Sequence, residues 1–191
     1  MRISMKSVCG TRRHTTLRFL ATAALLFCAG SALGVVHNML SATATLVPTS
    51  GSTVSGTLTF DEPKDRVVHI KGTIEGLTPG KHGFHVHVNG NCDSPDGMSA
   101  GGHFSPAGGR HGAPTAKEHH PGDLGNIEAD ANGRATVDMM VPGVSIALMG
   151  MTSIADRSIV IHTREDDYSD PAGNSGARVA CGVIESDMMR M

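Results

Sequence analysis

Residues 83–92 read G-F-H-V-H-V-N-G-N-C, and they begin the stretch 83–126 around which the chain is organised. His85 and His87 are two positions apart, so in a β-strand both side chains point to one face, about 7 Å apart. Phe84 and Val86 then point to the opposite face. This pattern predicts a strand that packs a core with one face and offers a pair of imidazole ligands on the other.

More histidines follow in glycine- and proline-rich sequence that lacks regular periodicity as far as residue 124. It contains S-A-G-G-H-F-S-P at 99–106, R-H-G-A-P at 110–114 and E-H-H-P-G-D-L-G-N at 118–126. A segment of this length without secondary structure is usually functional or disordered, and its histidines favour function.

Seven residues of the chain are candidate metal ligands, because imidazoles with a single carboxylate suit copper or zinc. They are His85, His87, His103, His111, His120, Asp123 and His162. Seven exceed the needs of one tetrahedral zinc ion but suffice for two four-coordinate ions that share a ligand. His82 has the wrong strand parity for this set, and we expect it to make a structural hydrogen bond instead.

Short apolar-alternating runs, separated by turn residues, predict β-structure for the rest of the chain. We expect strands at 42–47, 53–60, 67–75, 83–88, 125–129, 135–141, 158–162 and 178–184. The turn D-A-N-G at 130–133 favours a hairpin between two of them. Eight short strands without helical periodicity predict an all-β sandwich or barrel, and the tail 185–191 is expected to fray.

The first 34 residues have the pattern of a secretory signal peptide. Five basic residues and no acidic residue surround the start of an apolar run at 19–29, and small residues follow at 32–34. The apolar run is short for a membrane span, although an uncleaved anchor is the alternative. Arg12-Arg13 leaves twin-arginine export open beside ordinary secretion. We expect 1–34 to be removed and 35–191 to form one domain.

Charge and cysteine content change once this leader is set aside. It holds five of the 16 Lys and Arg residues and none of the 18 Asp and Glu residues, which leaves a formal charge of −7. That charge excludes a basic nucleic-acid footprint and a polybasic membrane patch. Cys92 and Cys181 remain, and an oxidising compartment favours a disulfide over two separate buried thiols. Closing a loop of nearly 90 residues would contribute roughly 4–5 kcal/mol on the chain-entropy model.

Taken together, the motifs resemble those of the Cu,Zn superoxide dismutase family, and of its exported bacterial type in particular. The motifs are G-F-H-V-H at 83–87, A-G-G-H-F-S-P at 100–106, H-G-A-P at 111–114, H-P-G-D-L-G-N at 120–126, V-I-H-T-R-E-D-D at 160–167 and G-N-S-G-A-R-V-A-C-G-V-I at 173–184. The resemblance covers about 42–184. It implies an eight-stranded antiparallel Greek-key β-barrel that dismutates superoxide to oxygen and hydrogen peroxide.

Carried over by position, the resemblance also implies a role for each site residue. Copper would be held by His85, His87, His103 and His162, and zinc by His103, His111, His120 and Asp123. His103 would then be a bridging imidazolate and, with the anion-guiding Arg178, catalytic. Asp166 matches the carboxylate that links a copper-ligand histidine to a zinc-ligand histidine. Cys92 and Cys181 match the intrasubunit disulfide.

The resemblance sets further expectations about partners and location. Superoxide is the expected substrate, with no nucleic acid, no membrane anchor after signal cleavage, and a location in the periplasm or outside the cell. Relatives occur as homodimers and as monomers, so a homodimer and a monomer both stay open. The loop 168–177 lacks the lysines that many eukaryotic relatives carry, which weakens the case for long-range steering. Two other functions compete: a copper-binding or copper-delivery domain on the same scaffold, and a zinc-stabilised extracellular interaction domain.

Overall fold

The computed structural model describes residues 40–187, all within one compact unit, His37–Met191. The expected signal peptide, residues 1–34, lies outside the described residues. The described part contains nine strands and one 3-10 helix: β1 Leu40–Pro48, β2 Ser55–Lys64, β3 Val67–Glu75, β4 Gly80–His87, η1 Met98–Ala100, β5 Asp123–Ala129, β6 Ala135–Pro142, β7 Ser158–His162, β8 Arg178–Val183 and β9 Glu185–Ser186. No helix in residues 40–187 is long and apolar enough to cross a membrane.

The strands form one antiparallel sheet that closes on itself. Their order is β2-β3-β6-β5-β4-β7-β8-β1-β9, and the additional pairing of β1 with β2 completes the barrel. The neighbours β3 and β6, β4 and β7, and β8 and β1 are not consecutive in the chain, which is the Greek-key arrangement. The predicted eight-stranded antiparallel barrel is therefore confirmed, with β9 as one extra short strand.

The strand bounds follow the sequence pattern closely where the pattern is local. β3 and β7 begin and end at the predicted residues. The tail prediction was wrong for its first two residues, because Ser186 pairs with Ala42 and Glu185 with Thr43 of β1. Ser41 Oγ also donates to Asp187 Oδ2 over 2.6 Å. Partners more than 140 positions away leave no trace in a local pattern.

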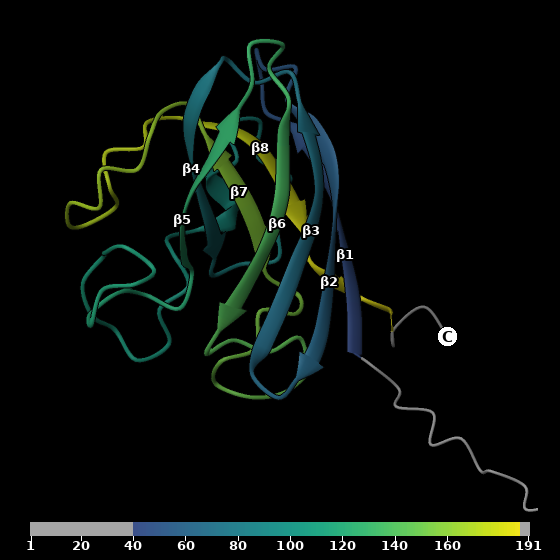
Figure 1. The fold of residues 1–191 in the computed structure, drawn as a ribbon, viewed down its shortest axis with the longest axis vertical. Coiled ribbons are helices and arrows are strands. Elements are labelled where there is room, and N and C mark those ends of the chain that lie inside the picture. Colours follow the sequence, from purple (N-terminus) through teal and green to yellow (C-terminus); the bar gives the residue numbers. More distant parts are fainter. Residues whose placement is uncertain (1–39, 188–191) are drawn as a thin grey trace, which may run out of the picture. The chain divides into compact units, whose positions relative to one another are not determined.

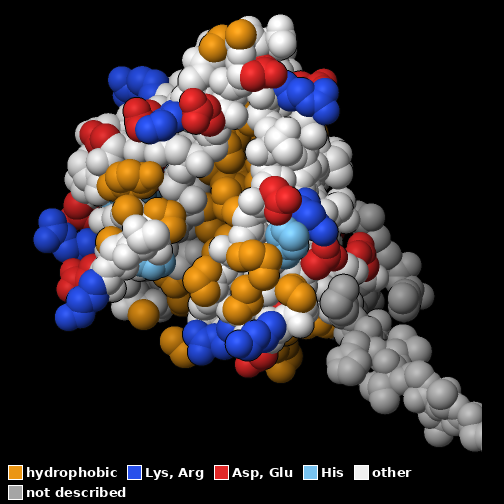
Figure 2. Space-filling view, viewed as in Figure 1, with side chains coloured by type: hydrophobic (Ala, Val, Ile, Leu, Met, Phe, Trp, Pro, Cys, Tyr) orange, Lys and Arg blue, Asp and Glu red, His pale blue; other side chains and the backbone are white. Residues whose placement is uncertain are grey.

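The barrel core is aliphatic with three phenylalanines. Its fully buried large side chains include Phe60, Phe84, Ile70 and Ile161. On β4, Phe84 and Val86 enter this core, as the alternation predicts. The space-filling view also shows hydrophobic side chains at the surface of the barrel, on the side of the molecule that faces the viewer (Figure 2). A close-packed core gives β4 and β7 a rigid position from which to present side chains on their other face.

Two long connections lie outside the barrel on the side of β4 and β5 (Figure 1). One joins β4 to β5 and carries η1; the other, 163–177, joins β7 to β8. Both contain ligand candidates or their neighbours. The fold thus brings two loops far apart in sequence over the same outer face of the barrel.

Candidate metal centre

Four histidines meet on the outer face of β4 and β7, and we call them the four-histidine group: His85, His87, His103 and His162. β4 supplies His85 and His87, whose ring centroids are 6.5 Å apart. His162 ends the neighbouring strand β7. His103 comes from the loop and pairs with His87 through an isolated β-bridge. Each residue offers one nitrogen within 4.8 Å of the others, which is close enough to share an ion.

A second group of ligand atoms lies beside the first and shares His103. We call it the aspartate group: His103, His111, His120 and Asp123. Nδ1 of His103 lies 2.8 Å from Asp123 Oδ1, and Nδ1 of His111 lies 2.9 Å from the same oxygen. Nδ1 of His120 lies 3.2 Å from Asp123 Oδ2. Three imidazole nitrogens thus converge on one buried carboxylate, the donor set of a tetrahedral zinc site.

Backbone carbonyls fix which nitrogen is free on two members of the four-histidine group. A carbonyl oxygen only accepts, so Nδ1–H of His87 donates to Gly101 O over 2.9 Å, and Nδ1–H of His162 donates to Gly176 O over 3.1 Å. A neutral imidazole has one N–H, so Nε2 of each ring is left as an unprotonated ligand. Both Nε2 atoms are buried without a hydrogen-bond partner in the described part of the chain.

Asp166 fixes the tautomers of one histidine in each group. Its Oδ2 accepts from Nε2–H of His85 over 2.8 Å, and its Oδ1 accepts from Nε2–H of His111 over 2.9 Å. Nδ1 of both rings is therefore left unprotonated. Nδ1 of His85 makes no hydrogen bond to any described residue, and Nδ1 of His111 faces Asp123 Oδ1 at 2.9 Å without a proton to share. This linking position is the one predicted for Asp166. A carboxylate behind a ligating histidine commonly sets ring orientation and raises ligand basicity.

These unpaired nitrogens test whether the two sites fit metal ions. Buried polar atoms are nearly always satisfied, and one without a partner calls for an explanation such as a bound ion. His85, His87 and His162 direct such atoms into the four-histidine group, and His111 directs one into the aspartate group. The residues therefore fit one ion in each group.

Burial lowers the pKa values of three members of the four-histidine group. Desolvation lowers the pKa of His85, that of His87 well below its usual value, and that of His162 to about 3. These rings are neutral near pH 7, which is the state that binds a metal ion.

In the aspartate group, the pKa of His111 is raised and that of Asp123 is lowered. Burial alone would lower the pKa of His111, but the hydrogen bond to Asp166 and the charge of Asp123 outweigh it and raise the value. Burial likewise opposes ionisation of Asp123, yet hydrogen bonds from His103 and from the backbone N–H of His120 hold the pKa of that carboxyl far below its usual range. Asp123 is ionised at any physiological pH.

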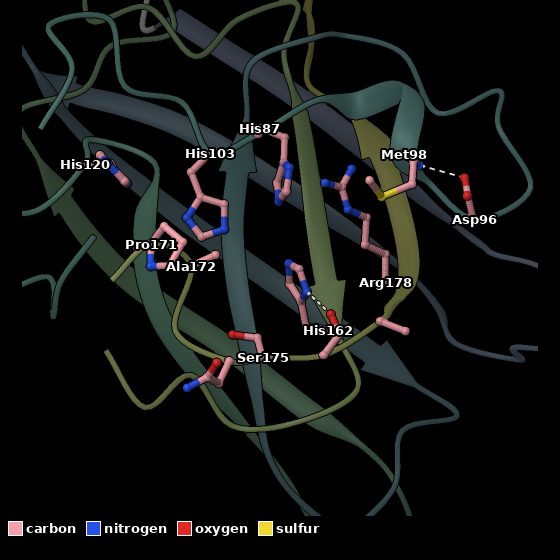
Figure 3. Close-up of a pocket in the computed structure, with 14 residues that line it drawn as sticks. His87, Asp96, Met98, His103, His120, His162, Pro171, Ala172, Ser175 and Arg178 are labelled. Carbon is pink, nitrogen blue, oxygen red and sulfur yellow. Dashed lines mark hydrogen bonds between the residues drawn. The ribbon is translucent and has the colours of Figure 1, made fainter. Parts of the chain in front are cut away.

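A cavity of about 570 Å³ opens onto the four-histidine group (Figure 3). His87, His103 and His162 line it together with Arg178, whose guanidinium donates to Gly97 O and Gly101 O, each over 2.6 Å. Burial lowers the pKa of Arg178, but a guanidinium stays charged at neutral pH. The cavity thus presents a fixed positive charge beside the histidines.

The disulfide predicted from cysteine usage is present between Cys92 and Cys181. Cys181 lies on β8, three residues after Arg178, and Cys92 lies in the loop that contains Gly97 and Gly101. The disulfide and the two guanidinium hydrogen bonds therefore attach the same loop to the same strand.

Two residues that support the site, Asn126 and Gly173, were not predicted from the sequence. Asn126 brackets Asp166 by donating from Nδ2 to its backbone O over 2.9 Å and accepting its N–H at Oδ1 over 2.7 Å. Gly173, at φ +68°, lies where a Cβ atom would collide with Asp166 Oδ1 and come within 2.7 Å of His111 Nε2. Asn126 closes the quoted motif 120–126, which was the available signal. His82 is structural as expected, its Nδ1 lying 2.7 Å from His162 O.

Comparison with known proteins agrees with this geometry. Residues 54–184 match the family described as copper/zinc superoxide dismutase. The chain is 44% identical over 149 residues to superoxide dismutase [Cu-Zn] 2 of Mesembryanthemum crystallinum, covering 74% of this chain and 93% of that protein. It also resembles the crystal structure of the clock protein EA4, with a TM-score of 0.68 and 40% identity over 76% of this chain and 93% of that one. The chain therefore belongs to the copper/zinc superoxide dismutase family.

Proposed function

We propose that this protein dismutates superoxide to oxygen and hydrogen peroxide. One observation carries the proposal beyond family membership: the ring of His103 belongs to both ligand groups, so one imidazole can join two ions. The four-histidine group would hold copper and the aspartate group zinc. Imidazole suits copper, while three imidazoles with one carboxylate suit zinc. When bound, copper supplies one-electron redox chemistry and zinc a fixed charge.

His103 is the residue that would move a proton. Its Nδ1 lies in the aspartate group, 2.8 Å from Asp123 Oδ1, which leaves Nε2 for the four-histidine group. Nε2 would take up a proton and donate it to the reduced substrate. A second proton from solvent completes hydrogen peroxide. His85, His87 and His162 stay neutral and hold their positions through Asp166 and the backbone carbonyls.

Arg178 would bind and orient the anionic substrate. Its guanidinium lines the cavity and is held by Gly97 O and Gly101 O, so its charge stays in one place during turnover. Because exposed charges are screened beyond about 8 Å at physiological salt, a fixed charge within the cavity can attract superoxide into a protein of negative net charge.

The test is dismutation by the mature protein loaded with copper and zinc, measured by pulse radiolysis or by competition with cytochrome c. Superoxide dismutases are known to approach the diffusional ceiling of about 10⁹ M⁻¹s⁻¹, and we expect a rate near it. His103→Ala should abolish turnover, whereas His119→Ala, a matched change of a neighbouring histidine outside both groups, should not. A loaded wild-type protein without turnover would instead favour the copper-delivery alternative.

We also propose that residues 1–34 are a cleaved signal and that 35–191 is an exported domain of the bacterial, periplasmic type. The basic stretch and apolar run of the leader support this, and so does the disulfide, which forms in oxidising compartments. The amino terminus of protein recovered from a periplasmic fraction should lie near residue 35. Full-length protein confined to the cytoplasm would overturn the proposal.

A homodimer of the mature chain is a further part of the proposal. Large exposed hydrophobic side chains, among them Met149 and Met151, offer apolar surface for pairing. Sedimentation equilibrium should give twice the mass of the mature chain. A monomer mass at micromolar concentration would contradict it.

A further inference from the structure

A methionine side chain lines the cavity that leads to the four-histidine group. Met98 begins η1, and Figure 3 shows it on the Arg178 side of the cavity, across from His103. Its exposed fraction is 60%, so the thioether is accessible from solvent and from the cavity together. Among the described residues lining this cavity it is the only sulfur ligand.

The backbone of Met98 is held firmly although its side chain is exposed. Its N–H donates to Asp96 Oδ1 over 2.9 Å, and its carbonyl accepts from Gly101 N–H over 3.0 Å. Arg178 hydrogen-bonds to the glycines on both sides of η1. The unbranched methionine side chain can then change rotamer at the cavity mouth while its backbone stays in place.

The ligand atoms at the base of the cavity differ from this thioether in access and in chemistry. Nε2 of His87 and Nε2 of His162 are buried and lack a hydrogen-bond partner among the described residues, so an ion can reach them only after leaving its carrier. Thioether sulfur is a soft ligand that suits Cu(I) better than it suits harder ions. Because Met98 is exposed while both Nε2 atoms are buried, the thioether can bind an incoming ion first.

We propose that Met98 is an uptake ligand for Cu(I): its Sδ binds the ion at the cavity mouth and passes it to Nε2 of His87 and of His162. The exchange changes coordination only, since the ion remains Cu(I) and no electron moves. Asp96, which also lines the cavity, offsets the charge of Arg178 for an incoming cation. The inference rests on the proposed function in one respect, that the four-histidine group takes copper.

The test follows copper transfer to zinc-loaded, copper-free protein under anaerobic conditions. The donor is the coloured Cu(I)–bicinchoninate complex, whose loss of absorbance in a stopped-flow instrument gives the transfer rate. Met98→Leu conserves volume, and Met140→Leu is the matched control, because Met140 is 52% exposed on β6. We expect Met98→Leu to slow Cu(I) transfer about tenfold, with the final copper content unchanged. Met140→Leu should transfer at the wild-type rate.

A parallel experiment with Cu(II)–glycine separates soft-ligand uptake from simple obstruction. Met98→Leu should take up Cu(II) at the wild-type rate, since a thioether gives the harder ion little advantage. An unchanged Cu(I) rate in Met98→Leu, or equal slowing for both ions, would overturn the proposal while leaving dismutase function intact. Wild-type protein that takes up no copper at all would instead remove the copper assignment, and this proposal with it.

Discussion

The two ligand groups share His103 but are built by different means. The four-histidine group takes three of its members from β4 and β7, and two of those are oriented by backbone carbonyls. The aspartate group takes His111 and His120 from a loop and gathers them around Asp123. The first is shaped by the barrel itself, whereas the second is shaped by carboxylate charge. We therefore expect removal of a ligand to have different consequences on the two sides.

The largest expected effect comes from removing one histidine from each side. His162→Ala should lower dismutation more than about 100-fold and leave zinc content near one per chain. His120→Ala should lower zinc content and the thermal midpoint first, because the loop loses an ion that holds it. Elemental analysis with activity on the same samples checks both, and His119→Ala is the control. If His120→Ala lost copper before zinc, the assignment of His120 to the zinc side would be contradicted.

The comparison extends to pH in the metal-free protein. The pKa of His162 is lowered to about 3, so below pH 6.5 the folded state binds fewer protons than the unfolded state. The folded state therefore loses up to about a few kcal/mol of stability as the pH falls towards 3. His111 has a raised pKa and opposes this in part. Ring resonances in NMR should show His111 titrating above 6.5 and His162 far below it. Similar midpoints for both would contradict the electrostatic difference between the groups.

Asp166 belongs to both sides, so its replacement should affect both. Asp166→Asn keeps the volume but cannot accept two N–H donors on equal terms, and we expect affinity for each metal to fall about 10- to 100-fold. Competition with chelators measures each affinity separately. Asp167→Asn is the control, since its side-chain partners are Ser169 and Asn174 at the surface. A loss confined to one metal would show that the link is not symmetric.

Gly173 allows its loop to approach Asp166 and His111. Gly173→Ala adds backbone strain of about 1–2 kcal/mol at φ +68° and a collision with Asp166 Oδ1. Gly143→Ala is a matched control at φ +86°, where no described atom lies within 4 Å of the added Cβ. The difference in unfolding free energy between the two variants isolates the collision. Equal destabilisation would mean that the loop moves aside freely.

The smallest expected effect belongs to a residue outside both groups. Arg178→Ala should slow the reaction about tenfold and flatten its dependence on ionic strength, with both metal contents unchanged. Arg164→Ala removes an exposed arginine of the neighbouring loop and should change the rate much less. Loss of copper from Arg178→Ala would mean that the guanidinium supports the ligands rather than the substrate.

Local sequence patterns predicted the barrel strands well, and they singled out the histidines and the aspartate that the structure brings together. Alternation located β3, which buries one face, and a short apolar run located β7, which is buried throughout. Histidine density and the two-residue spacing of His85 and His87 located the site. Both signals reside in side-chain identity, which the sequence states directly.

The supporting contacts could not be predicted in the same way. Every residue has a carbonyl, so nothing marks Gly101 or Gly176 as the partner of a histidine before the chain is folded. Gly173 looks like an ordinary turn glycine until its approach to Asp166 is seen. β9 likewise depends on a partner strand at the other end of the domain.

The wall of the cavity has a property that neither ligand group has. Residues 92–101 are fastened to β8 by a covalent bond at Cys181 and by the side chain of Arg178, within four positions of each other. A newly made chain with reduced thiols has only the weaker of these fastenings. We therefore expect the disulfide to hold this cavity wall, and with it the Arg178 guanidinium, more firmly than the two hydrogen bonds would alone.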